Sequence, residues 1–383
     1  MRKKGLSVML CAAMAASLLA GCGGGNKPAE TTAAPAAAET TAAAADTTAA
    51  PEKSEAETEA EAKDDAASGD LIVVGYAQVG AESDWRTANT ESFKSTFTEE
   101  NGYKLIFDDA QQKQENQIKA IRSFIQQDVD YIVVAPVVET GWEAVLQEAQ
   151  EAGIPVILSD RQMDVDESLY ECWVGGNFIK EGETAGNWLA DYLKAQGRDG
   201  EDINIVTLQG TIGASAQVGR TEGFGNILKQ HDNWKMLDMQ TGEFTQAKGQ
   251  EVMESMLKKH DNINVVYCEN DNEAFGAIDA IEAAGKKVGP DGDILVMSFD
   301  TTNAGLTDTL SGKIICNTEC NPLHGPRVQE IIEKLEAGEE PDKIAYVDEE
   351  MFAFDDTVKS VKVGDKDFDV TAISQEIIDG RAY

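Results

Sequence analysis

Short apolar runs alternate with segments of helical periodicity along the first part of the globular region. The runs occupy residues 71–74, 131–135 and 155–158. Between the first two runs, Ile118, Ile121, Phe124 and Ile125 recur at the spacing of one helix face. This alternation is typical of βαβ units in a parallel sheet. The pattern therefore predicts a first α/β lobe.

A second set of the same kind follows from about residue 175. Strands are expected at 203–208, 265–267 and 294–297, and helices at 181–195, 216–230, 245–260 and 273–284. The run 314–322 is strand-like until Pro322 breaks it; a helix at 325–337 and a strand at 344–347 follow. We predict an α/β protein with two doubly wound parallel-sheet lobes joined by a hinge. Lobe 1 comprises about 71–174 and 321–349, and lobe 2 about 175–320 and 350–383.

Polar side chains with binding chemistry follow the predicted strands. They are Glu82, Ser83, Asp84, Trp85 and Arg86 after the first strand, Asp160 and Arg161 after the third, and Arg220, Asn270 and Asp300 in the second set. Ligands of open α/β sheets bind beyond the carboxyl ends of the strands. Carboxylates and guanidinia form charge-assisted hydrogen bonds, and an aromatic ring offers an apolar face. The combination suits a small polyhydroxylated ligand such as a sugar.

Less specific interpretations of the same residues remain open. Asp160 and Arg161 could form a surface ion pair, and Arg220 could be a solvated residue of an amphipathic helix. Asn270 and Asp300 could cap helices, for which Asn and Asp are favoured. Trp142 is expected to pack at a helix start rather than to contact a ligand.

The N-terminus reads as an export signal followed by a tether. Residues 1–22 have a basic start, a short apolar run and the ending Leu-Ala-Gly-Cys. This ending resembles the bacterial lipobox, so Cys22 is the expected site of lipidation, and an ordinary secretion signal is the alternative. Residues 23–70 are rich in Ala, Thr and Glu and are expected to be a disordered acidic tether. We therefore expect an extracytoplasmic domain that is anchored by lipid to the cell membrane.

The strongly negative net charge and the placement of the cysteines limit the kinds of ligand and of covalent bond that are expected. The formal net charge is −37, and residues 23–70 contain only 11 acidic residues, so most of the negative charge belongs to residues 71–383. Such a charge argues against binding to nucleic acid. Cys172, Cys268, Cys316 and Cys320 are expected to be buried free thiols, although an extracytoplasmic location permits a disulfide. The sequence contains no metal-binding motif, and no cofactor is expected.

Several separated blocks resemble the periplasmic sugar-binding proteins of ABC transporters, the group that includes ribose- and galactose-binding proteins. The blocks include GYAQVGAESDWR, QQKQENQIKAIRSFIQQDVD, APVVETGW, LQGTIGAS and GEFTQAKGQEVMES. The resemblance is strongest to the members that bind galactofuranose, and it implies the type I binding-protein fold. It also implies that Phe244 supplies a second aromatic face and that Glu319 lies at the hinge, in addition to the residues named above. Asp84 stands where those members have Gly, which leaves the identity of the sugar open.

The resemblance implies a binding protein that closes around a monosaccharide and delivers it to a membrane permease, most simply as a monomer. An enzyme is not expected, because Arg161 beside Asp160 should keep that carboxyl ionised, whereas a glycosidase needs an acid of raised pKa. A transcriptional regulator is excluded by the export signal at the N-terminus. A sensor that signals to a membrane chemoreceptor or kinase remains an alternative. So does a protein that binds another small polyol, such as inositol, or a nucleoside.

Overall fold

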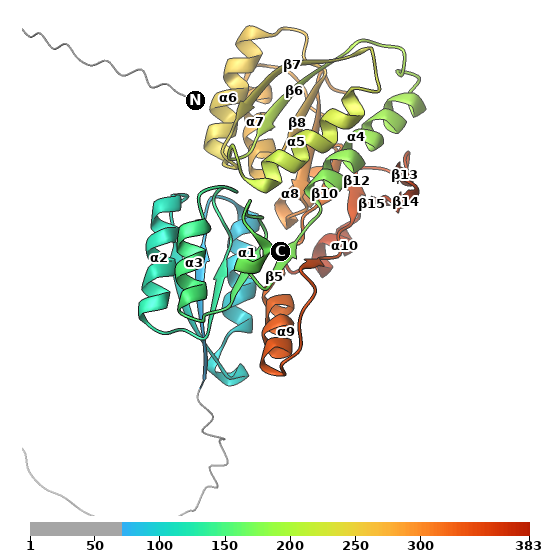
Figure 1. Ribbon diagram of the computed structural model, residues 1–383. Helices are drawn as coiled ribbons and strands as arrows, with labels where there is room; N and C mark the ends of the chain where they lie inside the picture. The colour runs from blue at the N-terminus through green and yellow to red at the C-terminus, as the bar shows by residue number, and fades with distance from the viewer. Residues whose placement is uncertain (1–70) are drawn as a thin grey trace, which may run out of the picture. The chain divides into compact units, whose positions relative to one another are not determined.

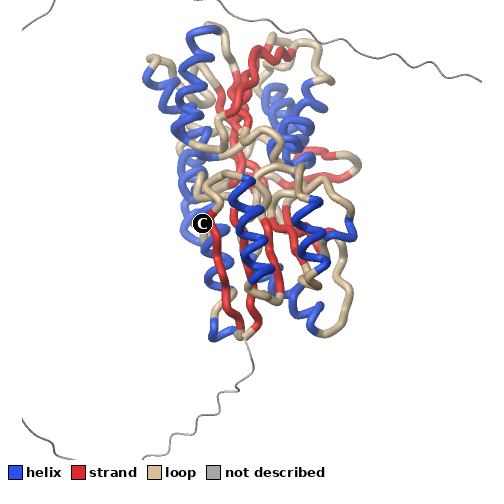
Figure 2. The backbone as a smooth tube through the Cα atoms, turned by 60° about the vertical axis from the view of Figure 1, so that its left-hand side comes forward, coloured by secondary structure: helices blue, strands red, loops and turns tan. Residues whose placement is uncertain are grey.

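The structure is a computed structural model that describes residues 71–383. The predicted signal peptide, its Cys22 and the acidic tether lie outside these residues. The described chain contains two sheets, each with helices on both faces (Figures 1 and 2). The prediction of two doubly wound parallel-sheet lobes is confirmed.

The first sheet is built from six strands. They are β1 (Ile72–Gln78), β2 (Tyr103–Asp109), β3 (Tyr131–Val134), β4 (Val156–Ser159), β5 (Cys172–Gly175) and β11 (Ile344–Tyr346). Their order in the sheet is β11-β5-β4-β3-β1-β2, and every neighbouring pair is parallel. The helices of this lobe are α1 (Asp84–Thr96), α2 (Gln114–Gln126), α3 (Glu143–Glu151) and α9 (Gly325–Glu336).

Burial on both faces explains why the central strands read as continuous apolar runs. In β3, Ile132 and Val134 belong to one hydrophobic cluster, whereas Tyr131 and Val133 belong to another on the opposite face. Parallel sheets that are covered by helices on both sides need apolar residues at successive positions. Trp142 is fully buried in the first of these clusters, which confirms its expected packing role.

The second sheet contains seven strands. They are β6 (Ile203–Gln209), β7 (Trp234–Thr241), β8 (Val265–Cys268), β9 (Leu295–Asp300), β10 (Cys316–Glu319), β12 (Met351–Ala353) and β15 (Thr371–Ala372). The order is β15-β12-β10-β9-β8-β6-β7, with only β10 and β12 antiparallel. Its helices are α4 (Phe178–Ala195), α5 (Ser215–Leu228), α6 (Gln246–Lys259), α7 (Asp271–Ala283), α8 (Asn303–Leu310) and α10 (Gln375–Gly380). The hairpin of β13 (Ser360–Val363) and β14 (Lys366–Asp369) lies beside α4.

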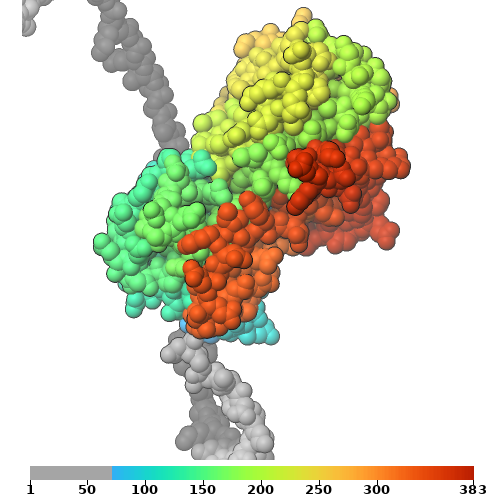
Figure 3. Space-filling model, turned by 45° about the vertical axis from the view of Figure 1, so that its right-hand side comes forward, coloured from blue at the N-terminus to red at the C-terminus, as the bar shows by residue number. Residues whose placement is uncertain are grey.

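Three segments carry the chain between the two sheets: residues 176–177 after β5, residues 320–324 after β10 and residues 347–350 between β11 and β12. After residue 320 the chain therefore contributes α9 and β11 to the first lobe and then returns to the second lobe with β12, β15 and α10. Figure 3 shows the orange residues of α9 against the blue-green first lobe and the red C-terminal residues beside the yellow-green second lobe. We refer to these three segments as the crossing segments.

All four cysteines between residues 71 and 383 are buried and unbonded to one another, as expected. Within the same residues, no helix is long and apolar enough to cross a membrane.

Candidate ligand-binding cavity between the sheets

The carboxyl ends of strands from both sheets converge on one small cavity. Its lining residues are Glu82, Ser83, Trp85, Arg86, Asp160, Arg161, Ala216, Arg220, Phe244, Asn270, Asp300 and Cys320.

Ten of the twelve predicted binding residues line this cavity. Asp84 does not, because its side chain is exposed in the first turn of α1, while its backbone N–H donates to Asn272 Oδ1 at 3.0 Å. Glu319 does not either: its carboxylate accepts hydrogen bonds from Arg381 Nη2 at 2.5 Å and from the backbone N–H of Glu350 at 2.7 Å.

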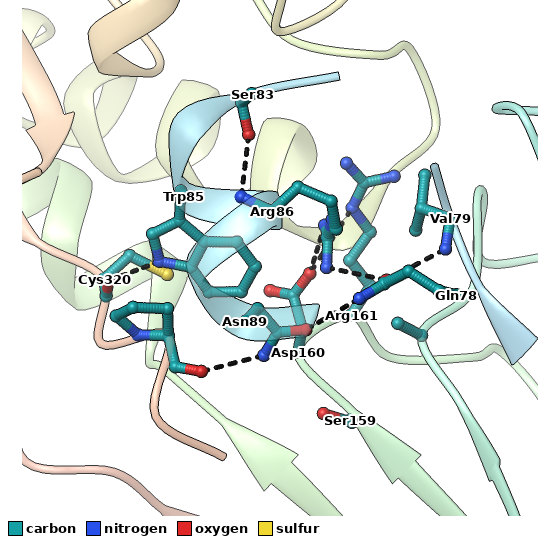
Figure 4. Close-up of polar contacts among 12 residues, drawn as sticks. Gln78, Val79, Ser83, Trp85, Arg86, Asn89, Ser159, Asp160, Arg161 and Cys320 are labelled. Carbon is teal, nitrogen blue, oxygen red and sulfur yellow. Dashed lines mark hydrogen bonds and ion pairs between the residues drawn. The ribbon is translucent and has the colours of Figure 1, made fainter. Parts of the chain in front are cut away.

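The sequence analysis missed two lining residues, Ala216 and Cys320. Ala216 lies in the first turn of α5, where a small side chain leaves room beside the cavity. Cys320 contributes its backbone carbonyl, which accepts a hydrogen bond from Trp85 Nε1 at 2.5 Å (Figure 4). The sequence did offer a signal for Cys320, because the predicted strand at 314–322 is broken by a proline just after this residue.

Carboxylates and guanidinia alternate along the first-lobe wall of the cavity. Arg86 Nε donates to Glu82 Oε1 at 2.9 Å. Arg86 Nη2 donates to Asp160 Oδ2 at 2.6 Å (Figure 4). Arg161 lies 3.6 Å from Glu82 and donates to the carbonyl of Val137 at 3.0 Å. Asp160 and Arg161 are 3% and 2% exposed, so they do not form a surface ion pair.

Supporting contacts fix this wall from behind. Ser83 caps α1, since its Oγ accepts the backbone N–H of Arg86 at 3.1 Å. Gln78, at the end of β1, accepts from Arg86 Nη1 at 3.2 Å and donates to Asn89 Oδ1 at 2.9 Å. The guanidinium of Arg86 is therefore held by side chains on three sides.

The second-lobe wall is organised around Arg220, which is 2% exposed and is not a solvated helix residue. Its Nε donates to Glu181 Oε2 at 2.7 Å, its Nη1 donates to the carbonyl of Glu269, and its Nη2 lies 3.4 Å from Asp300 Oδ1. Asn270 both lines the cavity and caps α7, because its Oδ1 accepts the backbone N–H of Glu273 at 2.8 Å. Asp300 does not cap a helix; Thr302 caps the following α8.

Two aromatic rings face the cavity, one from each lobe. Trp85 lies beside Arg86, whose guanidinium carbon is 4.7 Å from the indole centroid. Phe244 comes from the loop after β7, and the guanidinium of Arg161 lies 5.1 Å from the centre of its ring. The cation–π contact thus joins residues of the two lobes across the cavity.

The backbone is strained at three lining residues. Asp160, Phe244 and Asp300 have φ values of 64°, 60° and 96°. Asp tolerates the left-handed region, but for Phe this conformation is uncommon and costs energy. Such strain is concentrated at functional sites, where the surrounding contacts hold it in place.

Charges around the cavity determine which groups stay ionised. Burial tends to raise the pKa of Asp160, but Arg86 and Arg161 outweigh it and leave the pKa below the usual value. Burial and repulsion from Arg86 lower the pKa of Arg161 to about 10, so this side chain is still cationic at neutral pH. Burial raises the pKa of Asp300 well above its usual range, and Arg220 offsets only part of that effect.

Two buried polar atoms of the first-lobe wall have no hydrogen-bond partner within the part of the chain that the structure describes. Among the described residues, Glu82 Oε2 and Arg161 Nε are buried without a hydrogen-bond partner. Buried polar atoms in folded proteins are nearly always paired, so an acceptor and a donor at one cavity point to a ligand that supplies both functions. A hydroxyl group can donate to the first atom and accept from the second.

Although no metal-binding motif was found in the sequence, three side chains near the cavity could in principle hold a metal ion. Glu181, Cys320 and Glu349 bring potential ligand atoms within 4.8 Å of one another. The guanidinium of Arg220 already occupies one oxygen of Glu181, and its positive charge disfavours a second cation there.

Comparison with known proteins places the chain in a family. The profile of the periplasmic binding protein domain matches residues 74–318. The chain belongs to the periplasmic binding protein family. The galactofuranose-binding protein YtfQ of Escherichia coli K12 is 43% identical over 293 residues, which cover 75% of this chain and 89% of that protein. The curated relatives that it resembles are named as binding proteins rather than enzymes.

Solved structures of this family give the same result. A crystal structure of a Mycobacterium smegmatis protein in complex with β-D-fucofuranose is 46% identical, with a TM-score of 0.71 and coverage of 75% of this chain and 93% of that chain. The binding component of an arabinose ABC transporter from Shewanella sp. ANA-3, bound to L-arabinofuranose, is 40% identical, with a TM-score of 0.70 and coverage of 74% and 93%. This periplasmic binding protein thus shares its fold and much of its sequence with furanose-bound relatives.

Proposed function

We propose that this chain is an extracytoplasmic substrate-binding lipoprotein that captures a monosaccharide, preferably a furanose, and delivers it to an ABC importer. The observation that carries the proposal is the cavity wall of alternating carboxylates and guanidinia between two aromatic rings. The names of the relatives, which include a galactofuranose binder and an arabinofuranose complex, support the choice of sugar class. Lipidation of Cys22 and a monomeric state belong to the same proposal.

The wall suits an uncharged ligand with several hydroxyl groups. The wall holds two carboxylates, Glu82 and Asp160, and two guanidinia, Arg86 and Arg161. These charges balance, so a net charge on the ligand would gain little. Hydrogen bonds to ionised groups are shorter and stronger than those to neutral groups and can replace the water around a sugar. The indole of Trp85 and the ring of Phe244 would then cover the apolar faces of the sugar.

Entry of the ligand requires the two lobes to separate. The lining residues Arg86, Arg161 and Arg220 are each 2% exposed, so a sugar cannot reach them while the lobes are in contact. A ligand that touches both lobes stabilises the closed form by its higher affinity for that form. Rotation at the crossing segments supplies the opening motion.

The experiment that tests this function is a thermal-shift and calorimetry screen with the purified full chain. Galactofuranose and L-arabinose are compared with myo-inositol, which has no furanose form. A ligand that binds only the folded protein raises the melting temperature. A rise with the furanose-forming sugars supports the proposal, whereas a rise with myo-inositol alone contradicts the sugar class.

Glu82→Gln provides a matched test of the cavity. The substitution keeps the shape but replaces one carboxylate oxygen with an N–H donor, so we expect a loss in affinity of about tenfold or more. Glu91→Gln is the control, because Glu91 lies on the exposed face of α1 and pairs only with Lys94. Equal affinities for both variants would show that Glu82 does not contact the sugar.

A further inference from the structure

Two carboxyl groups meet where the crossing segments come together, just outside the cavity lining. Glu181 lies in the first turn of α4, and Glu349 lies in the third crossing segment. Cys320, in the second crossing segment, has its Sγ within 4.8 Å of oxygens of both carboxyl groups. Gly176, in the first crossing segment, lies beneath them, and an added Cβ there would overlap both Oε1 atoms.

The facing oxygens of this pair have no donor. Glu181 is 2% exposed; its Oε2 accepts from Arg220, but its Oε1 is buried without a partner. Glu349 Oε1 is also buried without a partner. Two carboxylate oxygens that face each other without a donor remain unsatisfied unless one of the carboxyl groups carries a proton.

The strongest influences on the pair come from one cation and several acids. Arg220 favours ionisation of both carboxyl groups, whereas Asp160 opposes that of Glu181 and Glu319 opposes that of Glu349. Arg220 is already engaged by Glu181 and lies near Asp300. Two neighbouring carboxylates in a buried site cannot both ionise easily, and one of them retains its proton.

We propose that Glu181 and Glu349 share one proton, and that this protonated pair positions Arg220 for the ligand. In this arrangement, the carboxyl group of Glu349 donates to Glu181 Oε1, and Glu181 Oε2 accepts from Arg220. Glu349 is thus a positioning residue that acts through Glu181. The proposal deepens the proposed function, on which it rests.

The titration of the two groups agrees with this geometry. Burial raises the pKa of Glu181, although Arg220 opposes it. Burial and the charge of Glu181 together raise the pKa of Glu349 well above its usual value. A carboxyl group whose pKa is raised in the closed form stabilises that form at low pH and loses this contribution as the pH rises through the raised pKa.

Sugar affinity should therefore fall as the pH rises above the ordinary range of carboxyl groups. Loss of the shared proton leaves two charges in contact, one on α4 and one on the third crossing segment, which opposes closure. Each unit by which the pKa in the closed form exceeds that in the open form changes the affinity about tenfold over the full titration.

The test compares the full-length protein with Glu349→Gln from about pH 5 to about pH 8. The amide of Gln is a neutral donor at every pH and reproduces a protonated Glu349. We expect the affinity of the natural protein for the sugar to fall at least about threefold more than that of the variant across this range. Asp348→Asn is the control, since it removes one negative charge from the adjacent exposed position and should keep the natural pH profile.

Melting temperatures without sugar provide a second readout that does not depend on the proposed function. The natural protein should lose stability relative to Glu349→Gln as the pH rises, whereas Glu349→Ala should be less stable than Glu349→Gln throughout.

Parallel pH profiles of the natural protein and Glu349→Gln, in both measurements, would overturn the shared proton. A stabilisation by Zn²⁺ that disappears in Glu349→Gln would also overturn it, by assigning the two carboxyl groups to a metal. Absence of sugar binding at every pH would instead contradict the proposed function and leave the stability comparison intact.

Discussion

At the scale of single residues, Gly210 decides where the aromatic ring of the second lobe lies. A Cβ at this position would fall inside the ring of Phe244. The backbone N–H of Gly210 also donates to Glu269 Oε2 at 2.9 Å, which fixes the turn after β6. Phe244 can therefore lie against the cavity only because its neighbour has no side chain.

Gly210→Ala should displace the ring of Phe244 and weaken sugar binding by about tenfold or more, because the aromatic face and its contact with Arg161 are lost. Calorimetry with the sugar measures this effect. Gly225→Ala is the matched control: Gly225 lies in α5, and a Cβ added there would meet no other atom, so Ala should stabilise the helix by up to about 1 kcal/mol. Unchanged affinity in Gly210→Ala would show that the position of Phe244 does not matter for binding.

The residue scale also shows where sequence reasoning reaches its limit. Asp160, Arg161 and Asn270 could be found because they directly follow apolar strands, and strand ends of parallel sheets face the ligand. Glu319 follows a strand in the same way, but Arg381 and Tyr383 engage its carboxylate from the end of the chain. A contact across more than sixty positions leaves no local pattern, so only the structure reveals it.

At the scale of elements, most interior strands were predicted, but the interior strands β5 and β12 were not, and neither were three of the four edge strands, β2, β7 and β15. β3 and β4 are buried on both faces and therefore read as apolar runs. β2 and β7 each have one neighbour, at the sheet edge, and their polar and apolar residues are mixed because they are only partly buried. The doubly wound architecture follows from the interior strands alone, which is why the fold could be inferred without the edges.

The N-terminus of α1 couples helix stability to binding. Ser83→Ala removes the hydroxyl that accepts the backbone N–H of Arg86, and we expect a loss of about 1 kcal/mol in the free energy of unfolding. Sugar affinity should fall as well, because the first turn of α1 carries Trp85 and Arg86. Thr98→Ala removes the cap of a short helical turn that does not line the cavity, and it should lower stability without affecting affinity. Denaturant titration and calorimetry separate the two effects; equal affinity losses in both variants would argue against a specific role of the Ser83 cap.

At the scale of the whole described chain, the cavity and the crossing segments form one system. Side chains from both lobes close the cavity, and the chain passes between the lobes beside it. Glu319, at the end of β10, accepts from Glu350 in the third crossing segment and from Arg381. The C-terminal Arg381 thus joins the end of β10 to the third crossing segment, beside the place where lobe movement must occur.

Arg381→Ala should destabilise the protein by more than an exposed ion pair would, because the side chain of Glu319 is only 5% exposed and would lose its cation. Loss of one partner of a buried pair costs about 3–5 kcal/mol, and the partial exposure of Arg381 places the expected loss at or below the lower end of that range. Glu319→Gln removes the charge that would be left unpaired, so the double variant should be more stable than the sum of the two single losses predicts, by about 0.5–3 kcal/mol. Urea denaturation of the four proteins measures this coupling. Strictly additive losses would mean that Arg381 and Glu319 contribute independently, and Arg381 would then have no specific part in joining β10 to the third crossing segment.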